Sequence, residues 1–576
     1  MQLEMPYIVP RTIIKKYKDE IEVPVVDIAE RIDSRWSSDN ELFIFDTNRY
    51  DKAIVDEFLA TADELSKDET LSSMFSKYKK KLQYVTRLTS SEKLGALKGI
   101  PLQINSYIDK SGMTNNRFYM TYGHSEELQP FTMTNCKWQA ADKYSPEHVS
   151  VSFKAILNNK VVEVHKTIYS QDTKAAGTLG ELFRRFGWYH ENAQLNADYL
   201  EQLEKYTKLY GLTGEVYKGS GSCEMHNTDR WSRASTFWFK DDTGSKVVID
   251  NIGPAIDDAT QNEKQSAVNK FVQGAFGTEQ VELAILPYIW GFHLEEHCWL
   301  LIHVNQLEQH KFAGKQLMDK LVLPETHKAL IDLLMTSTKE DIEDIIDGKK
   351  GGSFIMATGE PGTGKTLTAE VCSETIEKSL YKVQCSQLGL NVEQIEKNLS
   401  KVLKRATRWG SILLMDEADV YVRQRGSDIE QNAIVGVFLR NLEYYNGILF
   451  MTSNLDSIDD AILSRATAHI VYKKPIPDDV EAIYNIQSDL LNVKLSTEQL
   501  NILKSLEIVG RDIKALLKLA KFWLSNKHKA ELSMDEFMIL MSFIPATRKA
   551  IDKIISDDEE ATSKKFSQFI SKQVAS

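Results

Sequence analysis

Cysteine is scarce in this chain. Only five cysteines occur among 576 residues, and they are scattered: Cys136, Cys223, Cys298, Cys372 and Cys385. No two of them form a C-x-x-C pair, so the sequence indicates neither a zinc ribbon nor a disulfide framework. Sparse, unpaired cysteines are typical of proteins from a reducing compartment.

Long apolar stretches and an excess of positive charge are also missing. No run of eighteen apolar residues occurs, so we expect no membrane span. The first residues do not follow the basic-then-apolar pattern of a secretory leader, and we therefore expect a cytoplasmic protein. The formal net charge is −12. Because a general grip on nucleic acid needs clustered basic residues, a nucleic-acid partner is not expected.

The chain is long enough for several hydrophobic cores, and its pattern changes along its length. We predict a mixed α+β N-terminal region over 1–305, which could divide into subdomains at about 1–110 and 111–305. An α/β region over 306–474 follows, entered through a linker up to residue 316. Residues 475–576 read as helices, with a last amphipathic segment after 557. Helical patterns in the N-terminal region cover 50–65, 70–88, 178–186 and 196–210, and strand patterns cover 149–153, 235–239 and 299–304.

The most informative segment has the form G-x-x-x-x-G-K-T. A short apolar run over 353–358 precedes it and a helical pattern over 367–374 follows it, which is the strand–loop–helix context that a phosphate-binding loop requires. Glycines let the backbone wrap a phosphate, and the helix N-terminus adds partial positive charge. The nucleotide-binding residues predicted here are Gly359, Glu360, Pro361, Gly362, Thr363, Gly364, Lys365, Thr366 and Leu367. Lys365 would reach the phosphates of a nucleotide and Thr366 would bind Mg²⁺. A plain Gly/Pro loop ending in a solvated lysine is the alternative.

A second apolar run, over 411–415, ends in Asp416 and Glu417. It is typical of a parallel strand buried on both faces, whose C-terminal end would lie at the ligand-binding edge of the sheet. Asp416 would then bind Mg²⁺, and Glu417 would polarise the attacking water. The alternative is a helix beginning at Asp416, with acids placed to suit its dipole.

Two further polar residues follow in order. Asn454 ends a third apolar run, over 447–453, where its amide could orient a water near the γ-phosphate. Arg465 comes soon after, where it could stabilise transition-state charge in a neighbouring subunit. A strand-end cap and a surface charge are the alternatives for these two residues.

With these motifs in view, the chain from about 317 to about 525 resembles the AAA family of ATPases. The motifs are GEPGTGKT, LLMDEAD, MTSN and DDAILSR. The resemblance is to a bacterial, phage and fungal branch with one AAA module and a large N-terminal region. It implies a five-stranded parallel sheet followed by a helical lid. It also implies ATP and Mg²⁺ bound at a subunit boundary, usually in a hexameric ring.

The resemblance also implies roles for particular residues. Asn454 becomes the first sensor and Arg465 the arginine finger, although many members carry a pair of finger arginines. Arg511 lies in a segment similar to the lid motif that holds the second sensor, and many members have a small residue there. We therefore expect Glu417, Asn454, Arg465 and Arg511 to take part in catalysis.

One expected feature of peptide-threading members is missing. They place an aromatic residue on a pore loop after the second strand, but here the loop over 387–391 offers only Leu388 and Leu390. A second candidate loop, over 421–427, is basic and contains Tyr421. From these loops we expect clients to be displaced or passed as folded bodies.

The N-terminal region contains His293-x-x-Glu296-His297, which fits the H-x-x-E-H pattern of a zinc site on a helix. The flanking residues, Trp290 to Phe292 and Cys298 to Leu300, favour extended structure instead. We therefore expect a strand and turn here.

Together these observations predict an Mg·ATP-hydrolysing ring ATPase that remodels or translocates a protein client recognised by its N-terminal region. Two alternatives remain. One is an ATP-controlled assembly scaffold or switch, and the other is a nucleic-acid motor, which the acidic composition disfavours.

Overall fold

The computed structural model describes most of the chain from residue 92 to residue 548. The described residues are 92–111, 116–122, 127–226, 235–239, 245–257, 270–276, 280–336, 352–389, 391–426 and 428–548, together with the paired strands β1 (Tyr7–Pro10) and β2 (Leu42–Phe45). The helices predicted over 50–65 and 70–88, and the amphipathic segment after 557, lie outside the described residues. No helix in the described part of the chain combines the length and apolarity needed to cross a bilayer.

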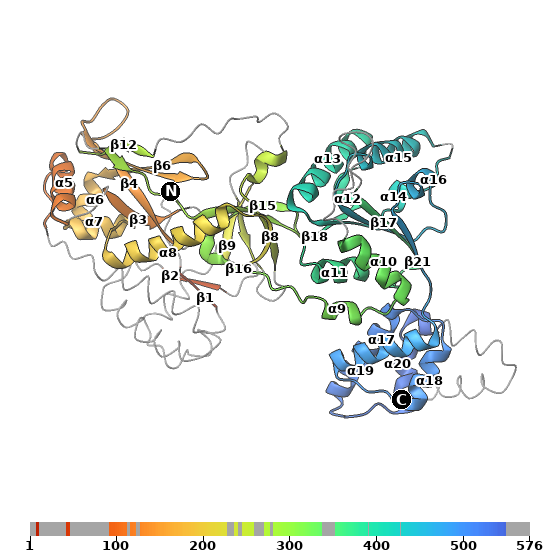
Figure 1. Cartoon of the computed structure of the whole chain (residues 1–576). Coiled ribbons are helices and arrows are strands. Elements are labelled where there is room, and N and C mark those ends of the chain that lie inside the picture. Colours follow the sequence, from red (N-terminus) through yellow and green to blue (C-terminus); the bar gives the residue numbers. More distant parts are fainter. Residues whose placement is uncertain are drawn as a thin grey trace.

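From residue 92 onward, the described elements form four successive bodies: two N-terminal sheets, a parallel sheet flanked by helices, and a helical body (Figure 1). This order confirms the predicted α/β class with a mixed N-terminal region and a helical end.

The first body is a five-stranded antiparallel sheet with helices packed on it. Its helices begin at clear sequence signals. For example, the Thr178 hydroxyl accepts the Glu181 N–H while the Glu181 carboxylate accepts the Thr178 N–H, which starts the predicted helix. The strand order is β6 (Lys160–Tyr169), β5 (His148–Leu157), β4 (Leu128–Gln139), β3 (Arg117–Thr121) and β7 (Tyr189–His190), and the helices are α5 (Ile100–Ser111), α6 (Ser170–Ala176), α7 (Leu179–Phe186) and α8 (Ala193–Tyr210), with a 3₁₀ turn at Leu97–Gly99.

The second body is a seven-stranded antiparallel sheet. Its order is β10 (Ser235–Trp238), β9 (Ser222–Met225), β15 (Cys298–His303), β14 (Tyr288–His293), β11 (Lys246–Asp250), β8 (Thr213–Gly219) and β16 (Leu307–Gln309). Strand β16 pairs with β8, so this sheet continues beyond the boundary expected at residue 305 and into the predicted linker. Leu307 packs against the buried cluster formed by this sheet and α8, and this contact explains why β16 stays paired with β8. Nearby lie 3₁₀ turns at Gly253–Asp257 and Val304–Gln306 and a two-stranded ribbon of β12 (Phe271–Gln273) and β13 (Gln280–Glu282).

The H-x-x-E-H segment is the turn of a hairpin, as expected from its neighbours. His293 ends β14 and His297 immediately precedes β15. The Glu296 N–H donates to Nδ1 of the buried His293 ring at 3.1 Å. The two histidines therefore do not share a helix face.

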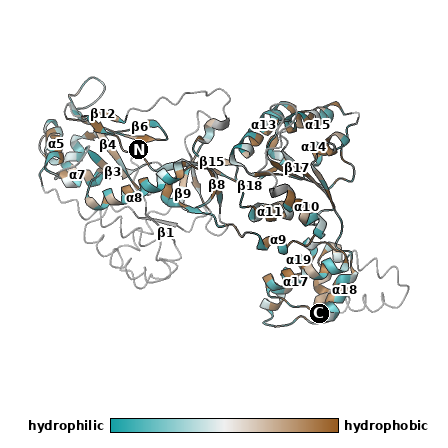
Figure 2. Cartoon of the chain, viewed as in Figure 1, coloured by the Kyte–Doolittle hydropathy of each residue, from teal (hydrophilic) through white to brown (hydrophobic). Residues whose placement is uncertain are grey.

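The third body contains the predicted five-stranded parallel sheet. Its strands are apolar along most of their length because helices cover both faces. Figure 2 shows hydrophobic and hydrophilic residues side by side on the covering helices α13 and α15, as expected for amphipathic helices. The order is β18 (Leu380–Gln384), β19 (Ile412–Asp416), β20 (Ile448–Ser453), β17 (Ser353–Gly359) and β21 (Ala468–Tyr472), and the helices are α9 (Gln316–Asp319), α10 (Glu325–Thr336), α11 (Lys365–Thr375), α12 (Cys385–Leu388), α13 (Val392–Trp409), α14 (Asp419–Val422), α15 (Ile429–Leu442) and α16 (Asp460–Leu463).

The fourth body is helical and has its own hydrophobic core. Ser496 and Ser533 begin two of its helices with capping boxes, each accepting a backbone N–H three residues later. The helices are α17 (Pro477–Leu491), α18 (Thr497–Ser505), α19 (Gly510–Asn526) and α20 (Met534–Ser542). In the described chain, every element from Pro477 to Ser542 is a helix.

The second and third bodies share one core. Phe292 and Trp299 of the antiparallel sheet contact the Trp409 ring at the end of α13, with ring centroids 5.0 and 6.0 Å apart. The fully buried Asp250 carboxylate accepts from Arg408 Nε and from the Trp409 indole N–H, both at 2.8 Å. The buried carboxylate is thus paired and hydrogen-bonded, as a buried charge requires.

We expect Trp409→Ala to lower the free energy of unfolding by about 3–5 kcal/mol, the usual cost of truncating a buried large aromatic side chain. Trp409 is 5% exposed, and its loss would also remove one hydrogen bond from Asp250. Denaturant-induced unfolding measures the change. Trp238→Ala is the control, because Trp238 is 46% exposed. An equal loss of stability in both variants would show that burial of Trp409 in the shared core does not stabilise the protein more than an exposed tryptophan does.

Candidate nucleotide site

The loop between β17 and α11 has a backbone that only glycine adopts readily. Gly359, Gly362 and Gly364 have φ of +142°, +87° and +105°. A Cβ on Gly359 would lie 2.2 Å from the Tyr472 carbonyl oxygen, and one on Gly362 would lie 2.8 Å from a Val509 methyl group. The loop therefore fits closely against β21 on one side and the start of α19 on the other. The N-terminus of α11 begins directly after it, where unpaired N–H groups favour an anion.

Lys365 is the buried cation of this loop. The residue is 6% exposed, and Nζ donates to the carbonyl oxygens of Gly359 at 2.6 Å and Glu360 at 2.8 Å. Nζ also donates to Asn454 Oδ1 at 2.9 Å, which joins the end of β20 to the loop. Burial lowers the pKa of Lys365 below its usual value, although nearby carboxylates oppose this shift.

Asp416, at the end of β19, is the second centre of the site. Its Oδ1 accepts from the hydroxyls of Thr366 at 2.8 Å and Thr452 at 2.7 Å, and its Oδ2 lies 2.8 Å from Lys382 Nζ. Burial alone would raise the pKa of Asp416, but the hydrogen bonds from Lys382 and the two hydroxyls outweigh burial and hold this pKa below its usual value. Asp416 is therefore ionised near neutral pH.

These residues fit a magnesium ion held together with nucleotide phosphates. Asp416 offers a carboxylate and Thr366 a hydroxyl at adjoining positions. Mg²⁺ prefers oxygen ligands and usually takes only one or two from the protein, the rest coming from phosphates and water. The donor set is therefore of the right kind and size.

Glu417 and Asn454 follow the ends of neighbouring parallel strands, β19 and β20. Glu417 is exposed and has φ of +53°, a conformation that is uncommon for a residue with a side chain. Its N–H donates to Thr452 Oγ1 at 2.9 Å, and the Asn454 N–H donates to Asp419 Oδ1 at 3.0 Å. Both residues thus lie at the same edge of the sheet as the phosphate loop.

The two predicted arginines lie in different surroundings. Arg511 is at the start of α19, and its Cβ lies 3.2 Å from the position that a Cβ on Gly362 would take, so it is beside the loop of its own chain. Arg465 donates instead to the Ala461 carbonyl oxygen at 3.1 Å and to Glu443 at 3.2 Å, and its side chain is 35% exposed.

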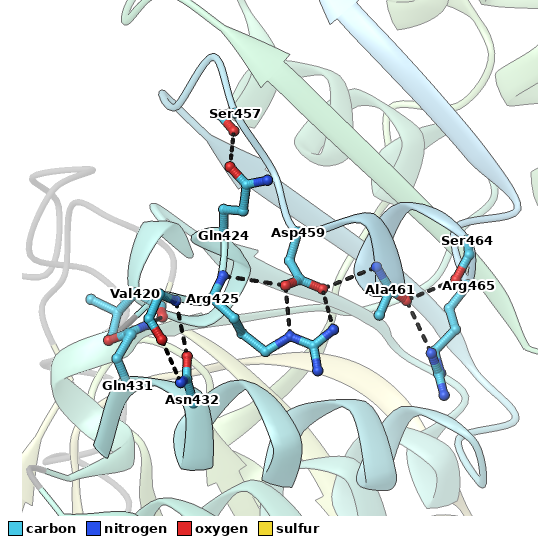
Figure 3. Close-up of polar contacts among 11 residues, drawn as sticks. Val420, Gln424, Arg425, Gln431, Asn432, Ser457, Asp459, Ala461, Ser464 and Arg465 are labelled. Atoms are coloured by element: carbon cyan, nitrogen blue, oxygen red, sulfur yellow. Dashed lines mark hydrogen bonds and ion pairs between the residues drawn. The ribbon is translucent and has the colours of Figure 1, made fainter. Parts of the chain in front are cut away.

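A buried aspartate supports the turn that carries Arg465. Asp459 accepts from the Arg425 guanidinium at 2.9 Å and caps α16 by accepting the Ala461 N–H at 3.0 Å. Figure 3 shows Asp459 between Arg425 and the turn that ends in Arg465. Of the site residues predicted from the sequence, the fold thus brings most together around the phosphate loop. Arg465 is the exception, since its described contacts are to Ala461 and Glu443.

Three further residues of this site were not predicted from the sequence. Thr452 bridges Asp416 and Glu417, Asp419 fixes the backbone of Asn454, and Lys382 pairs with Asp416. The signals were weak but present. Thr452 and Asp419 lie inside the quoted motifs, and Lys382 is a charged residue within a strand that is otherwise largely apolar.

The side chains of Leu388 and Tyr421, in the two candidate pore loops, are both buried, which agrees with the expectation that these loops do not grip a client chain. Leu388 belongs to α12 and is fully buried in the core, so its side chain is not free to contact a client. Tyr421 is 1% exposed, stacks on Phe438 and donates to the Cys385 carbonyl oxygen. Hydrophobic burial, which a short stretch of sequence does not reveal, is the reason in both cases. Residue 390 lies outside the described residues.

Comparisons with known proteins agree with this geometry. Residues 355–474 match the family model described as "ATPase family associated with various cellular activities (AAA)". The chain is 23% identical over 259 residues to the ATP-dependent zinc metalloprotease FtsH 1 of Rhodopirellula baltica, which covers 40% of this chain and 38% of that protein. It is 24% identical over 274 residues to the peroxisomal ATPase PEX6 of Saccharomyces cerevisiae, covering 44% and 23%.

A shorter relative is the uncharacterized AAA family ATPase y4kL of Sinorhizobium fredii, 29% identical over 136 residues, covering 22% of this chain and 41% of that protein. The chain thus spans between 23% and 41% of the length of these three relatives. The residues that match the family model include the phosphate loop and the acidic end of β19, and both lie at one edge of the parallel sheet. This part of the chain is an AAA-family ATPase module.

Proposed function

We propose that this protein hydrolyses Mg·ATP and uses the reaction to remodel a protein client bound by its N-terminal region. The observation that carries the proposal is a pair of hydrogen bonds at one edge of the sheet. Lys365 bonds to Asn454, and the next residue, Thr366, bonds to Asp416. Lys365 would contact the β- and γ-phosphates, and Thr366 and Asp416 would hold Mg²⁺. The bound ion would neutralise phosphate charge.

The remaining residues suit the attack of water on the γ-phosphate. Glu417, exposed at the strand end, would accept a proton from the attacking water, and Asn454 would orient that water. Arg511 would contact nucleotide bound to its own chain from the lid. These roles follow from the family resemblance. The places of Glu417 and Asn454 at the sheet edge and of Arg511 beside the loop support them.

Arg465 supports a site that is shared between subunits. Its described contacts are to Ala461 and Glu443 rather than to the phosphate loop of its own chain. We propose that it acts on the nucleotide of a neighbouring copy in a homo-oligomeric ring, by family analogy a hexamer. In that arrangement, each ATP site needs residues from two subunits.

The N-terminal region is proposed as the part that recognises the client. Its seven-stranded sheet shares a core with the ATPase module, so movements of the module would reach it directly. This connection supports displacement of a bound partner. A scaffold whose assembly is controlled by ATP would use the same connection, and only the fate of the client distinguishes the two.

Lys365→Ala tests nucleotide binding. We expect nucleotide affinity to fall on the order of tenfold to a hundredfold, because a hydrogen bond from a charged group contributes about 1.5–3 kcal/mol. Titration with a fluorescent ATP analogue measures the affinity. Lys205→Ala on α8 is the control, since Lys205 pairs with Glu201 on an exposed helix face. Unchanged affinity in Lys365→Ala would refute the proposed site.

A further inference from the structure

Lys382 of β18 is a cation that neither the sequence motifs nor the proposed hydrolysis step uses. The register of the parallel sheet pairs Lys382 with Leu414, two residues before Asp416 on β19. Side chains two residues apart share one face of a sheet, so the lysine can reach diagonally to the carboxylate. Its Nζ lies 2.8 Å from Asp416 Oδ2.

The two oxygens of Asp416 therefore have different partners. Oδ1 accepts the Thr366 and Thr452 hydroxyls, which are neutral donors, whereas Oδ2 pairs with a full positive charge. A divalent cation beside Thr366 would share this carboxylate with Lys382. Two cations close to one carboxylate repel each other, more strongly in a half-buried site than in water.

The backbone of Lys382 is firmly held while its side chain has room to move. The His297 ring, from the hairpin turn of the antiparallel sheet, hydrogen-bonds to the Lys382 backbone. The neighbouring Tyr381 is fully buried, and its ring lies 5.5 Å from that of His297. The Lys382 side chain, by contrast, is 39% exposed. It can therefore leave Asp416 without moving the strand.

We propose that Lys382 is a positioning residue that competes with Mg²⁺ for Asp416 and so sets how strongly nucleotide binding depends on the metal. The inference rests on the proposed ATPase function. With Mg·nucleotide bound, the ammonium group turns away from Asp416 toward solvent. When nucleotide and metal leave, it returns and neutralises the carboxylate.

The experiment compares the affinity for a fluorescent, non-hydrolysable ATP analogue in excess Mg²⁺ with that in excess EDTA. In Lys382→Met, the ratio of the two affinities should rise roughly two- to fivefold above that of the unaltered protein, the upper part of the range expected for a partly exposed ion pair. Lys382→Arg keeps the positive charge, and its ratio should stay near that of the unaltered protein. Lys382→Gln removes the charge but keeps a donor, and its ratio should rise as in Lys382→Met. It serves as the test if Lys382→Met fails to fold.

Lys246→Met is the matched control. Lys246 forms a comparable ion pair with Glu374 at 2.6 Å, side-chain exposure 36%, but does not pair with Asp416. Its ratio should not change. A general loss of stability would alter both affinities together and leave the ratio as it was.

The outcomes separate the inference from the function on which it rests. If the unaltered protein binds the analogue in neither condition, the proposed function fails. If it binds with a clear preference for Mg²⁺ but the ratio in Lys382→Met is unchanged or lower, the competition is wrong and the ATPase proposal stands. A ratio that rises in the Met and Gln variants, but not in the Arg and Lys246 variants, supports the inference.

Discussion

Glu417→Gln should bind ATP with nearly unchanged affinity and hydrolyse it about 10²–10⁴ times more slowly. The substitution removes the carboxylate that would take a proton from the attacking water, a contribution typical of general base catalysis. It leaves Asp416, Thr366 and Lys365 in place, and these residues are the proposed contacts of the metal and phosphates. Phosphate release measures hydrolysis, and a fluorescent analogue measures binding.

A matched substitution controls for the loss of a carboxylate. Glu396 on α13 pairs with Arg440 on the surface, and both are largely exposed. Glu396→Gln should therefore hydrolyse ATP at the normal rate. If Glu417→Gln also turned over normally, Glu417 would not be the base, and another acid near the site, such as Asp419, would have to be considered.

The same variant can identify the client. With ATP bound and hydrolysis blocked, a client engaged by the N-terminal region should remain attached, and comparison with Lys365→Ala would show which captured proteins depend on nucleotide. A protein captured only by Glu417→Gln, and released by the active enzyme with ATP, is expected for a remodelling ATPase. Stable ATP-dependent assemblies that contain only copies of this chain would favour the scaffold.

Arg465→Ala should lower hydrolysis on the order of 10³-fold, the lower end of the effect of an arginine that stabilises transferring phosphate. Because we propose that Arg465 acts on the neighbouring subunit, mixing this variant with Lys365→Ala should restore part of the activity. In a mixed ring, some boundaries join an intact phosphate loop to an intact arginine. Phosphate release by the mixture, after subunits have exchanged, measures the effect.

Two further variants test whether the ATP site is shared between subunits. Arg440→Ala removes an exposed arginine paired with Glu396 and should have little effect. Arg511→Ala should not be rescued by mixing with Lys365→Ala, since Arg511 lies beside the loop of its own chain. Mixtures no more active than their parents, despite proven exchange, would show that Arg465 does not act between subunits.

The parts of the site that could be predicted from sequence are those encoded locally. The loop 359–366 is defined by its glycines and by the strand and helix on either side of it. Asp416 and Asn454 were predictable because each follows an apolar run, and the ends of parallel strands meet at one edge. The five-stranded parallel sheet was predicted from the family resemblance, which rests on these same motifs.

What the sequence did not reveal depends on contacts between distant segments. The pairing of Lys382 with Asp416 requires the register of β18 against β19, and nothing in either strand alone specifies it. The burial of Leu388 and Tyr421 depends on α13 and α15 packing over them. The order of the strands in the two antiparallel sheets was likewise not predictable, because many pairings satisfy the same alternation of residues.

The phosphate-binding helix α11 is attached at both ends. Its first residues, Lys365 and Thr366, belong to the nucleotide site, while Glu374 in its last turn accepts from Lys246 Nζ at 2.6 Å and from the Ala313 N–H at 3.1 Å. Together with the buried contacts of Trp409, this attachment joins the antiparallel sheet to the ATPase module through two separate sets of contacts. In the proposed ring, a small rotation of one ATPase module against the next would therefore carry this sheet with it, and the shift would grow with distance from the module.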